Sequence, residues 1–109
     1  DRGNERVSHL YTPFHPSVLR LIRMTIEAAH RAGIFCGMCG EAASDTRLIP
    51  LLLGMGLDEF SMSAGALLAA RRLIRSLSYE ECKTIVEPAL SLPTATEVQA
   101  YLAGLPLCK

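Results

Sequence analysis

Hydrophobic residues recur at helical spacing in the segment 16–32, which reads PSVLRLIRMTIEAAHRA. The apolar stripe expected to be buried consists of Val18, Leu19, Ile22, Ile26 and Ala29. Proline is typical of the first helical position and glycine of the position after a helix ends, so Pro16 and Gly33 predict a helix over 16–32. The apolar run IFCGM at 34–38 then predicts a short buried strand.

The alternation of helix and strand then repeats. Asp45 is expected to cap a helix over 46–54, and the residues DEFSM at 58–62 predict a second strand. A third helix is predicted over 66–76, with an inward face made of Leu67, Leu68, Ala70, Leu73 and Ile74. Because a helix connects the two strands, the pattern favours parallel pairing.

Two more helices are predicted near the C-terminus. Each begins with a capping box, in which a hydroxyl and a carboxylate three positions on satisfy free backbone donors: Ser78 with Glu81, and Thr94 with Glu97. Pro88 is expected to end or kink the first helix, and Gly104 to close the second. Two strands are too few for a parallel sheet, so the chain is interpreted as an α/β segment from the end of a larger sheet or barrel.

Composition and charge narrow the classes of function. Half of the 109 residues are hydrophobic, and eleven basic residues balance eleven acidic ones. This balance argues against an electrostatic nucleic-acid or membrane binder, and no apolar run approaches the roughly 20 residues of a bilayer-spanning helix. The opening DRGNERVSHL has no export signal, so the four cysteines favour reduced thiols in a cytoplasmic protein over a disulfide framework.

The candidates for chemistry lie where strands end. In α/β sheets and barrels, ligands meet the loops that leave the carboxyl ends of the strands. One such loop begins at Cys39, Gly40 and Glu41, and Gly37 and Gly40 leave room for close approach of a ligand. Arg2 would follow a preceding strand in the same way, and an arginine suits a phosphate or carboxylate.

Simpler readings compete with these. The spacing of Cys36 and Cys39 resembles half of a zinc site or a redox pair, but no second ligand pair follows, and a redox motif normally opens a helix. In a strand the two side chains point to opposite faces. From the residues alone, Cys39 is as consistent with a small buried core residue as with a catalytic one. Glu41 and Asp45 are typical of loop or helix-cap positions, and His30 is typical of an exposed residue at a helix C-terminus.

Four longer motifs carry a resemblance to a known family: DRGN at 1–4, SHLY at 8–11, GMCGE at 37–41 and LLLGMGLDEFSMS at 51–63. With them, the chain resembles the C-terminal part of the phosphoenolpyruvate-binding barrel in enzyme I of the bacterial sugar phosphotransferase system. The broader family of phosphoenolpyruvate-utilising enzymes shares the cysteine turn. A fragment of a phosphoenolpyruvate synthase or pyruvate phosphate dikinase is therefore an alternative, as is a non-catalytic association module.

The resemblance implies a fold and a site. Residues 1–109 would be the C-terminal portion of a (β/α)8 TIM barrel, two βα units plus C-terminal helices, without the upstream strands and the phosphohistidine domain. Cys39 would be the proton donor, Arg2 would bind the phosphate, and Gly37, Gly40 and Glu41 would support the loop. Mg²⁺ would be the cofactor of the parent enzyme, with its ligands upstream and none in this segment.

The resemblance also implies a reaction and partners. The parent enzyme would move a phosphoryl group from phosphoenolpyruvate to its own histidine and on to a small phosphocarrier protein, releasing pyruvate and serving sugar uptake. It would be a cytoplasmic homodimer associating through the barrel domain, with no nucleic acid and no membrane insertion, and the segment alone is expected to be inactive. Ser44 departs from the glycine usual in the family and would be expected to alter the loop and the start of the next helix.

Overall fold

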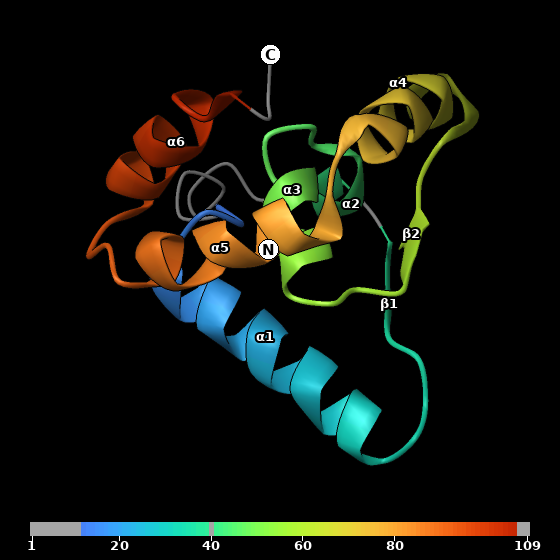
Figure 1. Ribbon diagram of the computed structural model, residues 1–109, viewed down its shortest axis with the longest axis horizontal. Coiled ribbons are helices and arrows are strands. Elements are labelled where there is room, and N and C mark those ends of the chain that lie inside the picture. The colour runs from blue at the N-terminus through green and yellow to red at the C-terminus, as the bar shows by residue number, and fades with distance from the viewer. Residues whose placement is uncertain (1–11, 40, 107–109) are drawn as a thin grey trace, which may run out of the picture.

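The computed structural model describes residues 12–39 and 41–106, which form a mixed α/β arrangement with one small sheet (Figure 1). The elements are α1 (Pro16–Arg31), β1 (Gly37–Cys39), α2 (Glu41–Ser44), α3 (Ile49–Gly54), β2 (Glu59–Ser61), α4 (Ala64–Ser76), α5 (Tyr79–Leu90) and α6 (Ala95–Ala103). This order confirms the predicted alternation, with α2 as an additional helical turn.

The two strands pair in parallel, as predicted, with Gly37, Met38 and Cys39 opposite Glu59, Phe60 and Ser61. The prediction of a buried strand over 34–38 was wrong in its position. Ile34 and Phe35 are 63% and 70% exposed, because they belong to the connection after α1 and no described element covers them. Pairing starts only at Gly37, where β2 comes alongside.

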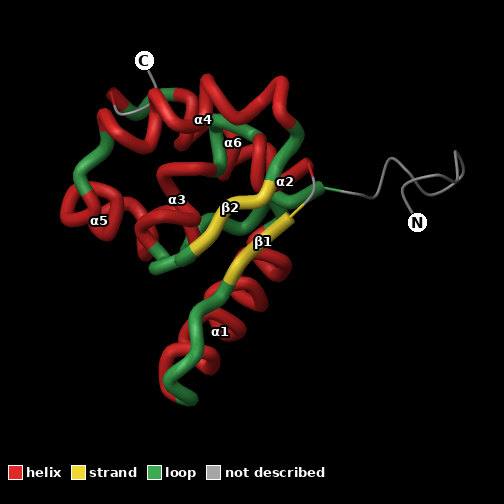
Figure 2. Tube along the Cα trace, turned by 90° about the vertical axis from the view of Figure 1, so that its right-hand side faces the viewer, coloured by secondary structure: helices red, strands yellow, loops and turns green. Residues whose placement is uncertain are grey.

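The faces of the sheet differ in what covers them. Met38 and Phe60, neighbours in the register, are partly buried and pack against the hydrophobic core. The residues on either side of them, Gly37, Cys39, Glu59 and Ser61, are exposed. Side chains alternate between the faces of a strand, so these four share the opposite face. In Figure 2 both strands run in front of the helices, and that outer face is bare of described elements.

The core is built around α3, whose sequence IPLLLG is almost entirely buried. Its main neighbour is α5, and the two helices meet at Gly54. A side-chain carbon at position 54 would overlap the backbone carbonyl of Cys82 and lie 3.0 Å from a methyl group of Val86. Glycine is therefore required for this close approach.

The helix expected over 46–54 begins later than predicted. Leu48 is its N-cap residue. Asp45 instead starts the preceding turn, where its backbone carbonyl accepts hydrogen bonds from the backbone N–H groups of Leu48 and Ile49. Its carboxylate accepts one from the backbone N–H of Arg47. An Asp that binds its own local backbone in this way competes with helix formation, which explains the delayed start.

Three predicted core residues are exposed. Val18 on α1 and Leu67 and Leu68 on α4 are 41%, 42% and 64% exposed, so the prediction of their burial was wrong. Helical periodicity identifies an apolar face but does not say whether a neighbour covers it. On α4, Ala70 is buried and the helix makes few contacts with the rest of the described chain.

The C-terminal helices begin as predicted. The hydroxyls of Ser78 and Thr94 accept hydrogen bonds from the backbone N–H three residues on, at 3.4 and 3.2 Å, and α6 ends at Gly104. The helix α5 does not end at Pro88 but runs to Leu90. A proline in the last turn removes only one backbone hydrogen bond, so the helix can continue past it.

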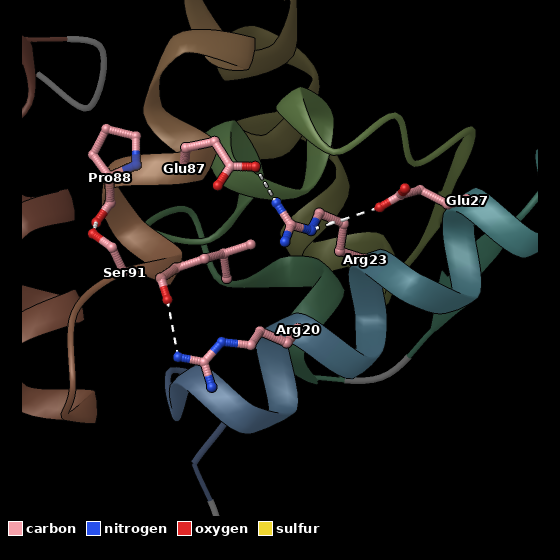
Figure 3. A network of polar contacts seen from close by, with 7 residues as sticks. Arg20, Arg23, Glu27, Glu87, Pro88 and Ser91 are labelled. Carbon is pink, nitrogen blue, oxygen red and sulfur yellow. Dashed lines mark hydrogen bonds and ion pairs between the residues drawn. The ribbon is translucent and has the colours of Figure 1, made fainter.

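Two arginines of α1 hold α5 in place, as Figure 3 shows. Arg20 donates to the carbonyl of Leu90 at 3.2 Å, and Arg23 pairs with Glu87 of α5 and with Glu27 of its own helix. The last turn of α5 contains no basic residue of its own. Arg20 thus supplies the positive charge that stabilises a helix C-terminus.

Substituting Gly54→Ala is expected to destabilise the chain by about 1–3 kcal/mol, since the new methyl group forces α3 and α5 apart. Thermal or urea unfolding of the 109-residue chain measures the effect. Gly65→Ala is the matched control on α4, where an added carbon meets nothing within 4 Å. Equal stability of the two variants would contradict the assigned role of Gly54.

Candidate functional site

The candidate site lies at the carboxyl end of β1. Cys39 is the last residue of β1, is exposed, and stands opposite Ser61 at the end of β2. The backbone of Glu41 begins α2 directly after the turn. Gly40 and Arg2 lie outside the described residues, so their predicted roles stay predictions.

The outer face of the sheet carries a short polar row beside Cys39. Glu59 lies across Gly37, with its Cβ and Cδ atoms 3.3 and 3.9 Å from where a Cβ of residue 37 would be. Ser61 donates a hydrogen bond to Oε1 of Glu59 at 3.4 Å. The space that Gly37 leaves open thus admits the side chain of Glu59, a residue that sequence reasoning did not select.

Cys36 has a different environment from Cys39. It is partly buried, packs against the core, and lines an apolar pocket of about 230 Å³ with Leu21, Ile22, Thr25, Ile26, Gly37, Met38 and Leu57. No disulfide joins Cys36 and Cys39. The positions of the two cysteines agree with the interpretation that their spacing is not a functional pair.

Close to the turn after α2, Asp45 and Arg47 form a bidentate ion pair, with Nε and Nη2 of Arg47 3.1 and 2.9 Å from the two carboxylate oxygens. Partial burial acts to raise the pKa of Asp45, but the hydrogen bonds from Arg47 outweigh it and the pKa is lowered. The guanidinium also lies 4.6 Å from the ring centre of Phe14. These contacts occupy Arg47 structurally, at the rim of a pocket of about 270 Å³.

At the amino ends of the strands, Asp58 forms a clamp. Oδ2 of Asp58 accepts the backbone N–H of Cys36 at 2.8 Å and lies 2.7 Å from Nε2 of His30, and the backbone N–H of Asp58 donates to the carbonyl of Cys36. The hydrogen bond from Cys36, followed by that with His30, lowers the pKa of Asp58. His30 is partly exposed, as expected, but no sequence pattern predicted its pairing across 28 positions.

A second histidine also has a local role. Nδ1 of His15 accepts a hydrogen bond from the backbone N–H of Ser17 and so caps α1. Within the ranges 12–39 and 41–106, no group of three or more His, Cys, Asp or Glu side chains is arranged to hold a metal ion. No helix in that described part combines the length and apolar character needed to cross a membrane.

Comparisons with known proteins give a consistent result. Residues 1–79 match the family described as PEP-utilising enzyme, PEP-binding domain. The chain is 57% identical over 98 residues to the phosphoenolpyruvate-protein phosphotransferase of Staphylococcus carnosus (strain TM300), covering 90% of this chain and 17% of that protein. It is 55% identical over 102 residues to the enzyme of that name from Bacillus subtilis (strain 168), covering 94% and 18%. The chain therefore spans less than a fifth of the length of these relatives.

Replacing Asp58 by alanine is expected to lower the thermal midpoint of the chain at neutral pH and to have little effect in acid. The pKa of Asp58 is lowered in the folded state, so its stabilisation is present above the unfolded value of about 3.9 and is lost as the pH falls through the folded value. Thermal unfolding between pH 2 and 7 measures this.

Glu80→Gln is the control for loss of a carboxylate, because Glu80 is exposed and its contact with Lys83 is 3.8 Å long. A difference between wild type and Asp58→Ala that persists unchanged down to pH 2 would contradict the electrostatic role of the clamp.

Proposed function

Because this chain belongs to the PEP-utilising enzymes and matches their PEP-binding domain, we propose that it is part of a phosphoenolpyruvate-protein phosphotransferase. The substrates would be phosphoenolpyruvate and a small phosphocarrier protein, with an enzyme histidine upstream of this segment as the intermediate acceptor and pyruvate as the product. The relatives of that name at 54–57% identity support this proposal over a phosphoenolpyruvate synthase or pyruvate phosphate dikinase.

We propose further that residues 1–109 are the C-terminal portion of a (β/α)8 barrel. The described sheet supports this, since a parallel sheet of two strands has one bare face and open edges, whereas parallel sheets are normally covered on both faces. The exposed apolar side chains of α1, Leu21 and Met24, offer a surface for an upstream neighbour, and Leu21 lines the pocket next to β1. The bare face would then point into the barrel.

The observation that carries the assignment is the position of Cys39. It is an exposed thiol at the carboxyl end of a parallel strand, within the residues that match the PEP-binding domain. When phosphoenolpyruvate loses its phosphoryl group, the resulting enolate must be protonated at its methylene carbon. A thiol held at the strand end is suited to be that general acid.

The remaining roles are also proposals. Arg2 would bind the phosphate and stabilise the charge that develops during transfer. Gly37, Gly40 and Glu41 would support the turn that carries Cys39. Mg²⁺, when bound by residues upstream, would help to neutralise the phosphate. The parent would be a cytoplasmic homodimer.

One set of observations favours a second function, that of a non-catalytic association module. Leu21, Met24, Ile34 and Phe35 are each at least 63% exposed, and both strands have an unpaired edge among the described residues. Such surfaces drive association between chains. This function requires no chemistry at Cys39, so the two proposals are separated by mutation of that residue.

In a full-length protein that carries this segment, Cys39→Ser is expected to reduce pyruvate formation by roughly 100-fold or more, because a hydroxyl is a far weaker acid than a thiol. Binding of phosphoenolpyruvate, measured by calorimetry, should largely survive. Cys36→Ser is the matched control and should be mild. Wild-type turnover in Cys39→Ser would exclude the proton-donor role.

The purified 109-residue chain is expected to release no pyruvate from phosphoenolpyruvate and Mg²⁺, since it lacks the phosphoacceptor domain and the proposed metal ligands. A coupled assay for pyruvate tests this, with a full-length protein as the positive control. Light scattering on the same sample reports the association that the exposed surface predicts. Measurable pyruvate release by the 109-residue chain would contradict the proposal that essential parts of the site lie upstream of this segment.

A further inference from the structure

The loop that carries Cys39 is held at its far end by Arg47. The loop leaves β1 at Cys39 and runs through α2 to Asp45. At its first end, strand pairing places Cys39 opposite Ser61. At its other end, the carboxylate of Asp45 accepts hydrogen bonds from the backbone N–H of Arg47 at 3.0 Å and from the guanidinium at 3.1 and 2.9 Å. Both ends of the loop are therefore fixed by contacts within the described chain.

Arg47 also connects this loop to the segment before α1. Its guanidinium carbon lies 4.6 Å from the ring centre of Phe14, which is 2% exposed and belongs to the hydrophobic core. Thr12 and Phe14 from that segment, and Ala42 and Asp45 from the loop, line the same pocket of about 270 Å³. Open space rather than packed core thus lies between the two segments at this point, and Arg47 joins them there.

These contacts of Arg47 fix a geometry more than they stabilise the fold. The side chain of Arg47 is 51% exposed, and exposed ion pairs and cation–π contacts contribute little to the free energy of unfolding. Two parallel hydrogen bonds between a planar guanidinium and a planar carboxylate nevertheless hold both groups in one orientation. The contact with Phe14 relates that orientation to a ring that is itself immobilised in the core.

We propose that Arg47 is a positioning residue for the proton donor: by joining Asp45 to Phe14, it holds the loop so that the thiol of Cys39 keeps its orientation toward the substrate. This inference rests on the proposed function. Arg47 takes no part in the proton transfer itself, which runs from Cys39 to the enolate carbon. A displacement of about 1 Å caused by a substitution away from the reacting atoms can cost about 100-fold in rate, so a loop that is held at one end only would slow the reaction.

The first test measures pyruvate formation in a full-length protein that carries this segment. Arg47→Ala and Arg47→Lys should each lower kcat by about tenfold and leave KM for phosphoenolpyruvate within about twofold, because the orientation of the thiol changes and substrate binding does not. Lysine should not rescue, since an ammonium group cannot form the two parallel hydrogen bonds or lie flat on the ring of Phe14. The thermal midpoint should shift by only a few degrees. Arg72→Lys, on the exposed arginine of α4, is the control and should match wild type.

A double-mutant cycle with Cys39→Ser tests whether Arg47 acts through the thiol. In the Cys39→Ser background, Arg47→Ala should lower kcat by no more than about a further twofold, because no thiol remains to be oriented. Arg47→Lys replaces Arg47→Ala in the cycle if the alanine variant fails to fold. An equal loss of kcat in both backgrounds would overturn the inference, as would a kcat within twofold of wild type in Arg47→Ala or a full rescue by lysine. If Cys39→Ser alone turns over like wild type, the proposed function fails instead.

Discussion

The close approach of α3 and α5 at Gly54 is the contact on which the rest of the structure depends. It lets α3 lie in the centre of the hydrophobic core, between α2 and β2 along the chain. Since β2 is the next element after α3, the position of α3 determines where β2 begins. A methyl group at Gly54 would therefore disturb the strands as well as the helices.

The two ends of the sheet differ in the residues that they bring together. At the amino end, Asp58 and Cys36 exchange hydrogen bonds one residue before each strand begins, and this fixes the pairing register. At the carboxyl end, the same register brings Cys39 alongside Ser61. A shift of one residue would place Ser61 on the opposite face from Cys39, because side chains alternate along a strand. The hydrogen bonds between Asp58 and Cys36 at the amino end thus favour the register in which Ser61 lies opposite Cys39 at the carboxyl end.

Local signals predicted most of the elements, and the errors have physical causes. The hydroxyl caps at Ser78 and Thr94 were predictable because both partners lie within one helical turn. The burial of Leu68 was predicted wrongly because its environment depends on helices that are far away in the sequence. The burial of Ile34 was predicted wrongly because strand pairing begins only at Gly37, where β2 lies alongside. Among the candidates for chemistry, Cys39 could be selected from its position after a strand. Glu59 could not be selected, since it lies on the same face as Cys39 only because two strands far apart in the sequence pair, with Glu59 opposite Gly37.

The contact between Arg20 and the end of α5 sets a limit on how far this segment can be shortened. A piece that began at β1 would retain α3, α5 and most of the core, yet it would lose the guanidinium that satisfies the Leu90 carbonyl. It would also lose the burial of Leu19 and Ile26 against that core. The helix α1 therefore contributes to the same packed unit as α3 and α5, in part through a helix cap supplied from 70 positions away in the sequence.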